Sequence, residues 1–225
     1  MIKNYYKFIK ELRTKKGLSQ ADVAKKIEIS RSSYISFERG GSVELSLSQA
    51  TKLADLFGIS LEEMKTGQAS NYLKYKQMIL AFLRNEGEIT KTKLAKLLYF
   101  ADFSWFYYNL QSMSGMQYRK MQYGPVSESY FSIIDDMADK GEINIEKTKD
   151  GAMLISQTRS GAMVDLSDLN KKEEELIKNI GKKWKGKKTN EIVDFTHKQL
   201  PYIYAGDNEI VSYGLFTQED PDEIY

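Results

Sequence analysis

Helix-start signals recur at short intervals through the first 67 residues of this chain. Ser19-Gln20-Ala21-Asp22 and Ser46-Leu47-Ser48-Gln49 each have the form of a capping box, in which two side chains satisfy amides of the first helical turn. Ser30 can cap a further helix, and Ser60 starts another. With an amphipathic stretch from Tyr5 to Lys16, these closely spaced signals predict a bundle of five short helices.

The composition is that of a folded protein and limits its chemistry. The 225 residues suffice for one large domain or two modest ones. The chain has no cysteine, which excludes disulfides, and its single histidine, His197, excludes a multi-histidine metal centre. No apolar run reaches the roughly 20 residues that cross a bilayer, and no signal segment is recognised. We therefore expect a cytoplasmic protein without membrane contact and without a bound metal.

Charge is unevenly distributed along the chain. Residues 1–67 carry 12 Lys and Arg against 8 Asp and Glu, whereas the remainder carries 21 against 23. A basic first part favours an anionic partner for that part. Within it lies Ser30-Arg31-Ser32-Ser33-Tyr34-Ile35-Ser36-Phe37-Glu38-Arg39-Gly40, in which Tyr34 and Phe37 share one helical face. The arginines and the small serines then point away from the face that Tyr34 and Phe37 form. This pattern is expected of a helix that approaches an anion closely, and equally of an ordinary surface helix.

Two short helices joined by a tight turn form a helix-turn-helix arrangement. Here the sequence resembles the phage-repressor (XRE-type) family over residues 5–65. The resemblance is carried by the segments LSQADVAKKIEISRSSYISFERG and LSLSQATKLADLFGISLEEM. The resemblance implies DNA binding, with a recognition helix in the major groove. It also implies that Arg13 and Glu38 tie the first helix to the third. The residues that it places at the DNA are Gln20, Arg31, Ser32, Ser33, Ser36 and Arg39.

A small polar stretch separates this part from the rest, so we expect domains at residues 1–67 and 72–225 with a linker at 68–71. Helical spacing is predicted around residues 72–83, 90–105, 130–137, 176–184 and 192–195, with a turn at Gly124-Pro125. Alternation around Lys149-Asp150-Gly151 predicts a β hairpin over residues 143–155. The expected fold class is mostly α: a five-helix domain followed by an α+β, mainly helical domain with a small hairpin or sheet.

No catalytic constellation is recognised in the second part. His197 has no serine or cysteine partner signature, and the adjacent Asp135 and Asp136 point about 100° apart on a helix. Phosphate-binding glycine motifs are absent, so we expect neither an enzyme nor a cofactor. The lysine cluster at residues 182–188 can bind nucleic acid or simply complement a helix end. The aromatic residues crowded into 100–108 exceed one helix face, which favours either a protein interface or a thick core.

Three further segments resemble the Panacea domain over about residues 72–205. They are Leu94 to Asp102 (LAKLLYFAD), Tyr123 to Val126 (YGPV) and Thr196 to Ala205 (THKQLPYIYA), whereas residues 118–122 lack the tryptophan expected before the Gly-Pro turn. That family occurs in antitoxins, so the resemblance implies that this chain neutralises a protein toxin by binding it directly. The toxins of the family vary, and some of them resemble alarmone synthetases. The residues that it suggests for toxin binding are Tyr99, Asp102, Tyr107, Tyr118, Tyr123, Pro125 and His197, with the acidic residues 219–223 as a further contact.

Together these features predict a two-domain antitoxin. Its first domain would bind an operator as a homodimer, with half-sites about one helical turn apart, and repress its own operon. Three alternatives remain open at this point. The second domain could serve dimerisation or signal sensing in a phage-type repressor, or it could recruit a partner to a protease. It could also bind DNA itself, since a helix followed by the 143–155 hairpin would fit a winged helix.

Overall fold

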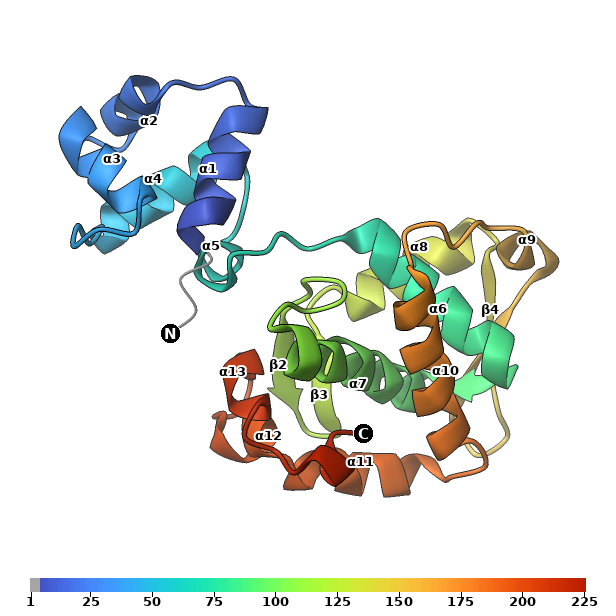
Figure 1. Cartoon of the computed structure of the whole chain (residues 1–225). Coiled ribbons are helices and arrows are strands. Elements are labelled where there is room, and N and C mark those ends of the chain that lie inside the picture. Colours follow the sequence, from blue (N-terminus) through green and yellow to red (C-terminus); the bar gives the residue numbers. More distant parts are fainter. Residues whose placement is uncertain (1–4) are drawn as a thin grey trace. The chain divides into compact units, whose positions relative to one another are not determined.

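The computed structural model describes residues 5–225, and the chain divides into two compact units, the first ending at Ser70 and the second running from Asn71 to Tyr225. Each unit has its own hydrophobic core. The fold is mostly helical with two small antiparallel sheets, as the sequence predicts (Figure 1). None of the helices between Tyr5 and Tyr225 is long and apolar enough to cross a membrane.

The first unit contains the five predicted helices. The side chains of Ser19, Ser46 and Ser60 each accept a hydrogen bond from the amide three residues later. The side chain of that later residue accepts one from the serine's own amide, so all three sites are capping boxes. Gly58 ends the fourth helix in the left-handed conformation that glycine adopts without penalty. The five helices are α1 (Tyr5–Lys15), α2 (Gln20–Lys26), α3 (Arg31–Glu38), α4 (Leu47–Phe57) and α5 (Leu61–Thr66).

The second unit is built around one long helix. Its helices are α6 (Tyr72–Glu86), α7 (Lys91–Asn109), α8 (Tyr130–Asp139), α9 (Arg159–Ala162), α10 (Lys171–Trp184), α11 (Thr189–Lys198), α12 (Leu200–Tyr204), α13 (Tyr213–Phe216) and a 3₁₀ turn (Pro221–Glu223). Its strands are β1 (Ile89–Thr90), β2 (Tyr118–Met121), β3 (Gly124–Ser127), β4 (Ile143–Lys147) and β5 (Met153–Gln157). Figure 1 shows α7 in the middle of this unit, with α6 and α10 beside it.

The central helix α7 is buried on every side over residues 94–104. A helix that is apolar around its whole circumference requires neighbours around that circumference, and α6, α10, α11, α13 and β3 supply them. Of the two alternatives for the aromatic residues of 100–108, a protein interface or a thick core, the structure supports the thick core. Phe100 and Phe103 are fully buried, Trp105, Phe106 and Tyr107 pack partly against the same core, and only Tyr108 is exposed.

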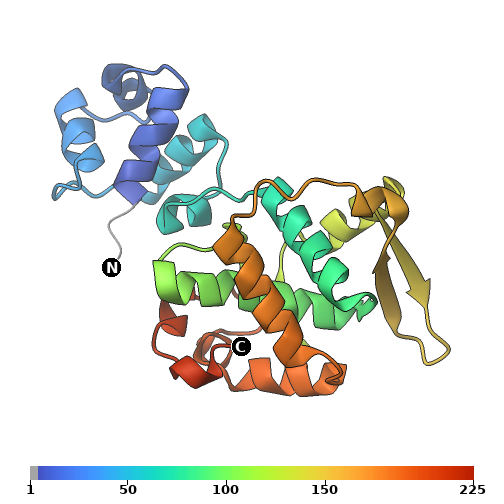
Figure 2. The same ribbon diagram turned by 45° about the vertical axis from the view of Figure 1, so that its right-hand side comes forward.

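The predicted hairpin is present as β4 and β5, and it gains a third strand. Strand β1 pairs with β5, with Ile89 opposite Ile155, so that the sheet order is β1-β5-β4. The hairpin extends away from the helices (Figure 2). The chain order from α6 onward is α6, β1, α7, β2, β3, α8, β4, β5, so a helix, α8, directly precedes the β4–β5 hairpin, as the winged-helix alternative requires.

The turn predicted at Gly124-Pro125 is wrong by two residues. Both residues belong to strand β3, which pairs with β2, and the turn between these strands is at Gln122 and Tyr123. Pro125 lies opposite Lys120 in this two-stranded sheet. A proline has no amide hydrogen to donate, but an edge strand does not need one on its outer side, so the strand tolerates it.

The acidic residues near the C-terminal end pack onto the second unit. The amide of Leu200 donates to the Glu219 carboxylate, and the Gln199 side chain donates to the Glu223 carbonyl at 3.0 Å. Ile224 is buried in the core. Residues 219–223 are therefore held against α11 and α12 rather than free to reach out toward a partner.

Candidate functional site

Helix α3 exposes a polar face at the surface of the first unit. Arg31, Ser32 and Arg39 are exposed, whereas Ser33 and Ser36 are half-buried. The Ser30 hydroxyl accepts a hydrogen bond from the Ser33 amide at 3.0 Å, which fixes the start of the helix. The arginine of the first helical turn thus stands on a capped and well-ordered helix end.

A buried ionic cluster fixes the opposite face of α3. Glu38 accepts hydrogen bonds from Arg13 Nε at 2.6 Å, from Gln20 Nε2 at 2.7 Å and from the Tyr34 hydroxyl at 3.3 Å. Burial opposes ionisation of Glu38, but the bonds from Arg13 and Gln20 outweigh it and lower its pKa. The predicted tie between Arg13 and Glu38 is confirmed. Gln20, a predicted DNA contact, is part of this cluster through its amide nitrogen.

The turn after α3 packs tightly on the helix. The Gly41 amide donates to the Ser36 carbonyl at 2.8 Å, and a Cβ at position 41 would overlap the Ser36 hydroxyl. Ser36 therefore faces the Gly40-Gly41 turn as well as the exposed side of the helix. The turn that follows α3 is therefore positioned by a residue of α3.

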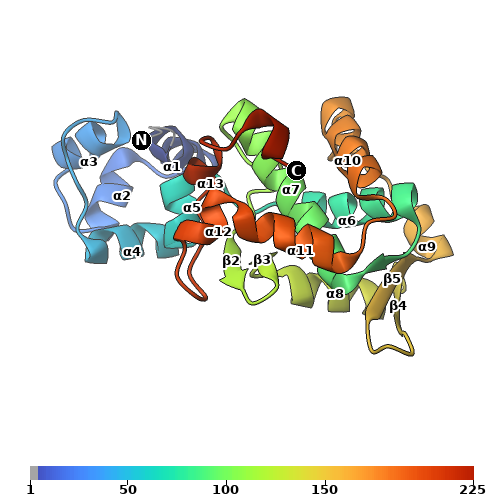
Figure 3. The same cartoon turned by 90° about the horizontal axis from the view of Figure 1, so that it is seen from below.

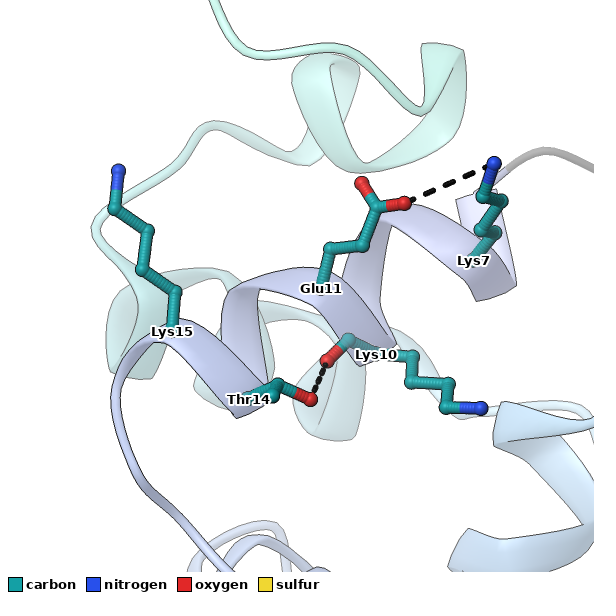
Figure 4. A pocket seen from close by; sticks show the side chains of 5 residues that line it. All are labelled: Lys7, Lys10, Glu11, Thr14 and Lys15. Carbon is teal, nitrogen blue, oxygen red and sulfur yellow. Dashed lines mark hydrogen bonds and ion pairs between the residues drawn. The ribbon is translucent and has the colours of Figure 1, made fainter.

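A shallow pocket on α1 offers no convergent chemistry. It is lined by Lys7, Lys10, Glu11, Thr14 and Lys15 (Figure 4). Lys7 and Glu11 form an exposed ion pair, and the Thr14 hydroxyl donates to the Lys10 carbonyl. The side chains of Lys10 and Lys15 point away from each other (Figure 4). This arrangement is that of a solvated helix surface.

In the second unit, the three segments that resemble the Panacea domain converge. Lys96 of the first segment is fully buried and donates to the Pro125 carbonyl of the second at 2.8 Å. Gly124 lies against the third segment, because a Cβ on it would be 2.5 Å from Thr196 Oγ1. Burial lowers the pKa of Lys96 to about 7. Lys96 and Thr196 carry no signal of this role in the sequence, since lysine and threonine on a helix are ordinarily surface residues.

Asp102 is the centre of a buried polar network. Its carboxylate accepts from the Ser114 amide and the Ser114 hydroxyl, both at 2.6 Å, and from the Tyr118 hydroxyl at 2.7 Å. Burial raises the pKa of Asp102 to about 6 although these bonds favour the charged form. The Tyr99 ring packs against Tyr118, 5.7 Å between centroids. Three of the seven predicted toxin contacts, Tyr99, Asp102 and Tyr118, thus lie inside the core and offer no surface to a partner.

Of the other four suggested toxin contacts, all but Pro125 lie at least partly at the surface. Tyr123, at the β2–β3 turn, is 61% exposed. Pro125 is buried beside it, and Tyr107 is half-buried against Phe216. His197 is half-buried, and its ring stacks on Tyr202 with centroids 4.3 Å apart. Burial, then the charges of Lys96 and Lys120, lower the pKa of His197.

Exposed apolar side chains occur both on the β2–β3 hairpin and on α12. The Tyr202 hydroxyl of α12 donates to the Met121 carbonyl at 3.2 Å, and Lys120 donates to the Ala205 carbonyl at 2.9 Å. These bonds fix α12 beside the β2–β3 hairpin (Figure 3). We call the exposed side chains that result the hairpin–α12 surface; it comprises Met121, Tyr123, Ile203 and Tyr204.

Helix α8, which precedes the β4–β5 hairpin, has an acidic exposed face. Asp135 and Asp139 are exposed; Asp135 forms an ion pair with Lys91 at 3.6 Å, and Asp136 forms ion pairs with Lys76 and Lys140. Carboxylates at this position repel DNA phosphates. The helix-then-hairpin order that the winged-helix alternative requires is therefore present, but α8 lacks the charge of a DNA-reading helix.

Comparison with known families agrees with both resemblances. Residues 9–64 match the family model described as helix-turn-helix, and residues 94–201 match the one described as "Antitoxin SocA-like, Panacea domain". The chain thus joins an XRE-type helix-turn-helix DNA-binding domain to a SocA-like Panacea antitoxin domain. Both are non-catalytic families. No curated protein and no solved structure matches the chain.

Proposed function

We propose that this protein is the antitoxin of a toxin–antitoxin pair, which neutralises its toxin through the second unit and represses its own operon through the first. The observation that carries the proposal is the union, in one chain, of a SocA-like Panacea domain with a helix-turn-helix domain whose α3 exposes Arg31, Ser32 and Arg39. A regulator that binds both its operator and its toxin can adjust transcription to the amount of free toxin.

In the first unit, α3 is proposed to enter the major groove. Arg31 would bond a guanine edge, while the small side chains of Ser32, Ser33 and Ser36 allow the helix to come close. Arg39 would contact a phosphate, and Gln20, held by Glu38, would bond the DNA at the start of α2. A homodimer would place two such helices about one helical turn apart on the operator.

Replacing Arg31 by alanine is expected to weaken operator binding by roughly 10- to 100-fold, because a bidentate guanine contact carries about 1–3 kcal/mol. Replacing Arg39 instead removes a phosphate contact, which should weaken binding to every sequence. It should also make the slope of log K against log salt less steep by about 1. Titrations of both variants against operator and scrambled duplexes measure the difference. Equal losses on the two duplexes for Arg31→Ala would contradict base recognition by Arg31.

In the second unit, the hairpin–α12 surface is proposed as the toxin contact. Tyrosine supplies a large contact area and a polar tip at little entropic cost, which makes it frequent at the centre of protein interfaces. Tyr123 and Tyr204 are 61% and 72% exposed. The hydrogen bonds that the Tyr202 hydroxyl and the Lys120 ammonium group donate to backbone carbonyls hold the β2–β3 hairpin and α12 together.

The double variant Tyr123→Ala/Tyr204→Ala is expected to bind the toxin on the order of 100-fold more weakly, since two interface anchors are removed. Binding can be measured by calorimetry with the co-expressed toxin. The matched control is Phe131→Ala/Met163→Ala, which truncates two exposed apolar side chains elsewhere on the same unit. If the control weakens binding as much as the tyrosine variant does, the contact surface has been misplaced.

Growth of cells that express the product of the adjacent gene tests the proposal as a whole. We expect that product to arrest growth and the full chain carrying Arg31→Ala to restore it, because neutralisation needs no operator binding. A harmless neighbour, or rescue that requires Arg31, would instead favour the phage-type repressor. A neighbour whose lifetime shortens when this chain is present would indicate a protease adaptor.

A further inference from the structure

The C-terminal half of α10 and the turn into α11 form a strongly cationic surface. Residues 178–188 contain six lysines, and residues 176–190 contain no aspartate or glutamate. Lys178, Lys182 and Lys185 follow one another at spacings of four and three residues, so they lie along one side of the helix. All three are exposed, as is Lys188 at the start of α11. We call these four residues the α10 lysine surface.

The end of α10 does not need these lysines for its own stability. Lys93 of α7 donates to the Trp184 carbonyl at 2.6 Å and to the Lys187 carbonyl at 2.9 Å, so the helix end already has a cation on its carbonyls. Burial of Lys93 in this position lowers its pKa. The usual structural explanation for lysines at a helix C-terminus is therefore largely satisfied by another residue.

The two remaining lysines of the cluster have partners within the fold. Lys187 forms an ion pair with Glu191 at 3.5 Å, and Lys183 lies over the rings of Phe195 and Tyr225. By contrast, none of the carboxylates that the structure describes lies within ion-pair distance of any member of the α10 lysine surface. Four like charges are thus left facing solvent on a short stretch of surface.

The chemistry of this surface suits a phosphate backbone better than a protein. Residues 164–202 include no large hydrophobic side chain that is exposed. Protein interfaces depend on aromatic or apolar anchors and are depleted in lysine, whereas phosphate contacts require only positioned positive charge. Duplex DNA is also the polyanion to which the helix-turn-helix domain brings this chain.

We propose that the α10 lysine surface is a second, sequence-independent DNA contact of this protein. It would bind the phosphate backbone and add affinity that falls with salt, while base recognition stays with α3. Neutralisation of a toxin through the hairpin–α12 surface does not depend on it, so the two proposals can fail separately.

The test is the salt dependence of binding of the full chain to a random-sequence duplex. The variant Lys178→Gln/Lys182→Gln/Lys185→Gln is compared with Lys147→Gln/Lys149→Gln/Lys198→Gln, which removes the same charge at exposed positions elsewhere in the second unit. Each lost phosphate contact makes the negative slope of log K against log salt less steep by about 0.9. The slope of the first variant is therefore expected to be less steep by roughly 2 to 3 than that of the unmodified chain. The control is expected to keep the slope of the unmodified chain.

Two results would overturn the proposal. One is the same slope for both triple variants, which would mean that these lysines affect binding only through the net charge of the chain and not through a contact at this surface. The other is an unchanged slope together with lost toxin neutralisation in the growth assay, which would assign the lysines to an acidic protein partner. Repeating the titration in an Arg31→Ala background separates this contact from base recognition, because the lysine effect should persist there.

Discussion

Replacing Glu38 by alanine is expected to unfold the first unit and abolish operator binding. The Glu38 and Arg13 side chains are only 2% and 14% exposed, and the pair also takes in Gln20 and Tyr34. Removing one partner of a buried ion pair leaves the other charge uncompensated and costs about 3–5 kcal/mol. A unit of this size has roughly 5 kcal/mol of stability in total, so little of it would remain folded.

Thermal unfolding followed by circular dichroism, together with operator titration, measures this effect. The second unit should still melt as in the unmodified chain, because it has a separate core. Glu11→Ala is the matched control: it breaks the Lys7–Glu11 pair, whose side chains are 79% and 63% exposed at 3.9 Å. Such surface pairs are worth at most about 1 kcal/mol. A Glu38→Ala protein that binds operator as well as Glu11→Ala does would refute the structural role of the cluster.

The first unit could be predicted almost completely because its signals are local. Ser19 and Asp22, or Ser46 and Gln49, are three residues apart, and the helices they start are bounded by Gly17 and Gly58. Information of this kind survives in a short stretch of sequence. The cap, the apolar spacing and the end of each helix all favour the same structure.

The second unit was predicted less well because its decisive contacts join residues far apart in the chain. The hydrogen bond from Lys96 to the Pro125 carbonyl joins residues 29 positions apart, and the spacing of apolar residues in the sequence does not predict it. Strands β2 and β3 are short, and a Gly-Pro pair looks like a turn rather than the start of a strand. The segments that carry a family resemblance also include the side chains that hold the fold. Tyr99 and Asp102 belong to the core for that reason, while the exposed Tyr204 went unnoticed.

The convergence of those segments makes Gly124 a sensitive position of the second unit, and Gly124→Ala is expected to abolish toxin neutralisation while operator binding persists. The backbone φ of Gly124 is +91°, which alone costs an alanine about 1–2 kcal/mol. Its Cβ would also lie 2.5 Å from Thr196 Oγ1 and 3.0 Å from Lys96 Cε. Overpacking of this kind adds about 1–3 kcal/mol.

Neither neighbour of Gly124 can move freely. The Thr196 hydroxyl donates to the Val193 carbonyl at 2.8 Å, and Lys96 holds the Pro125 carbonyl from a fully buried position. Gly151→Ala separates the two costs, because Gly151 has a similar φ of +84° but nothing within 4 Å of an added Cβ. Its variant should lose only the backbone cost and keep neutralisation. If both variants melt at the same temperature and restore growth equally, close packing of β3 on α7 and α11 does not support the toxin-binding unit.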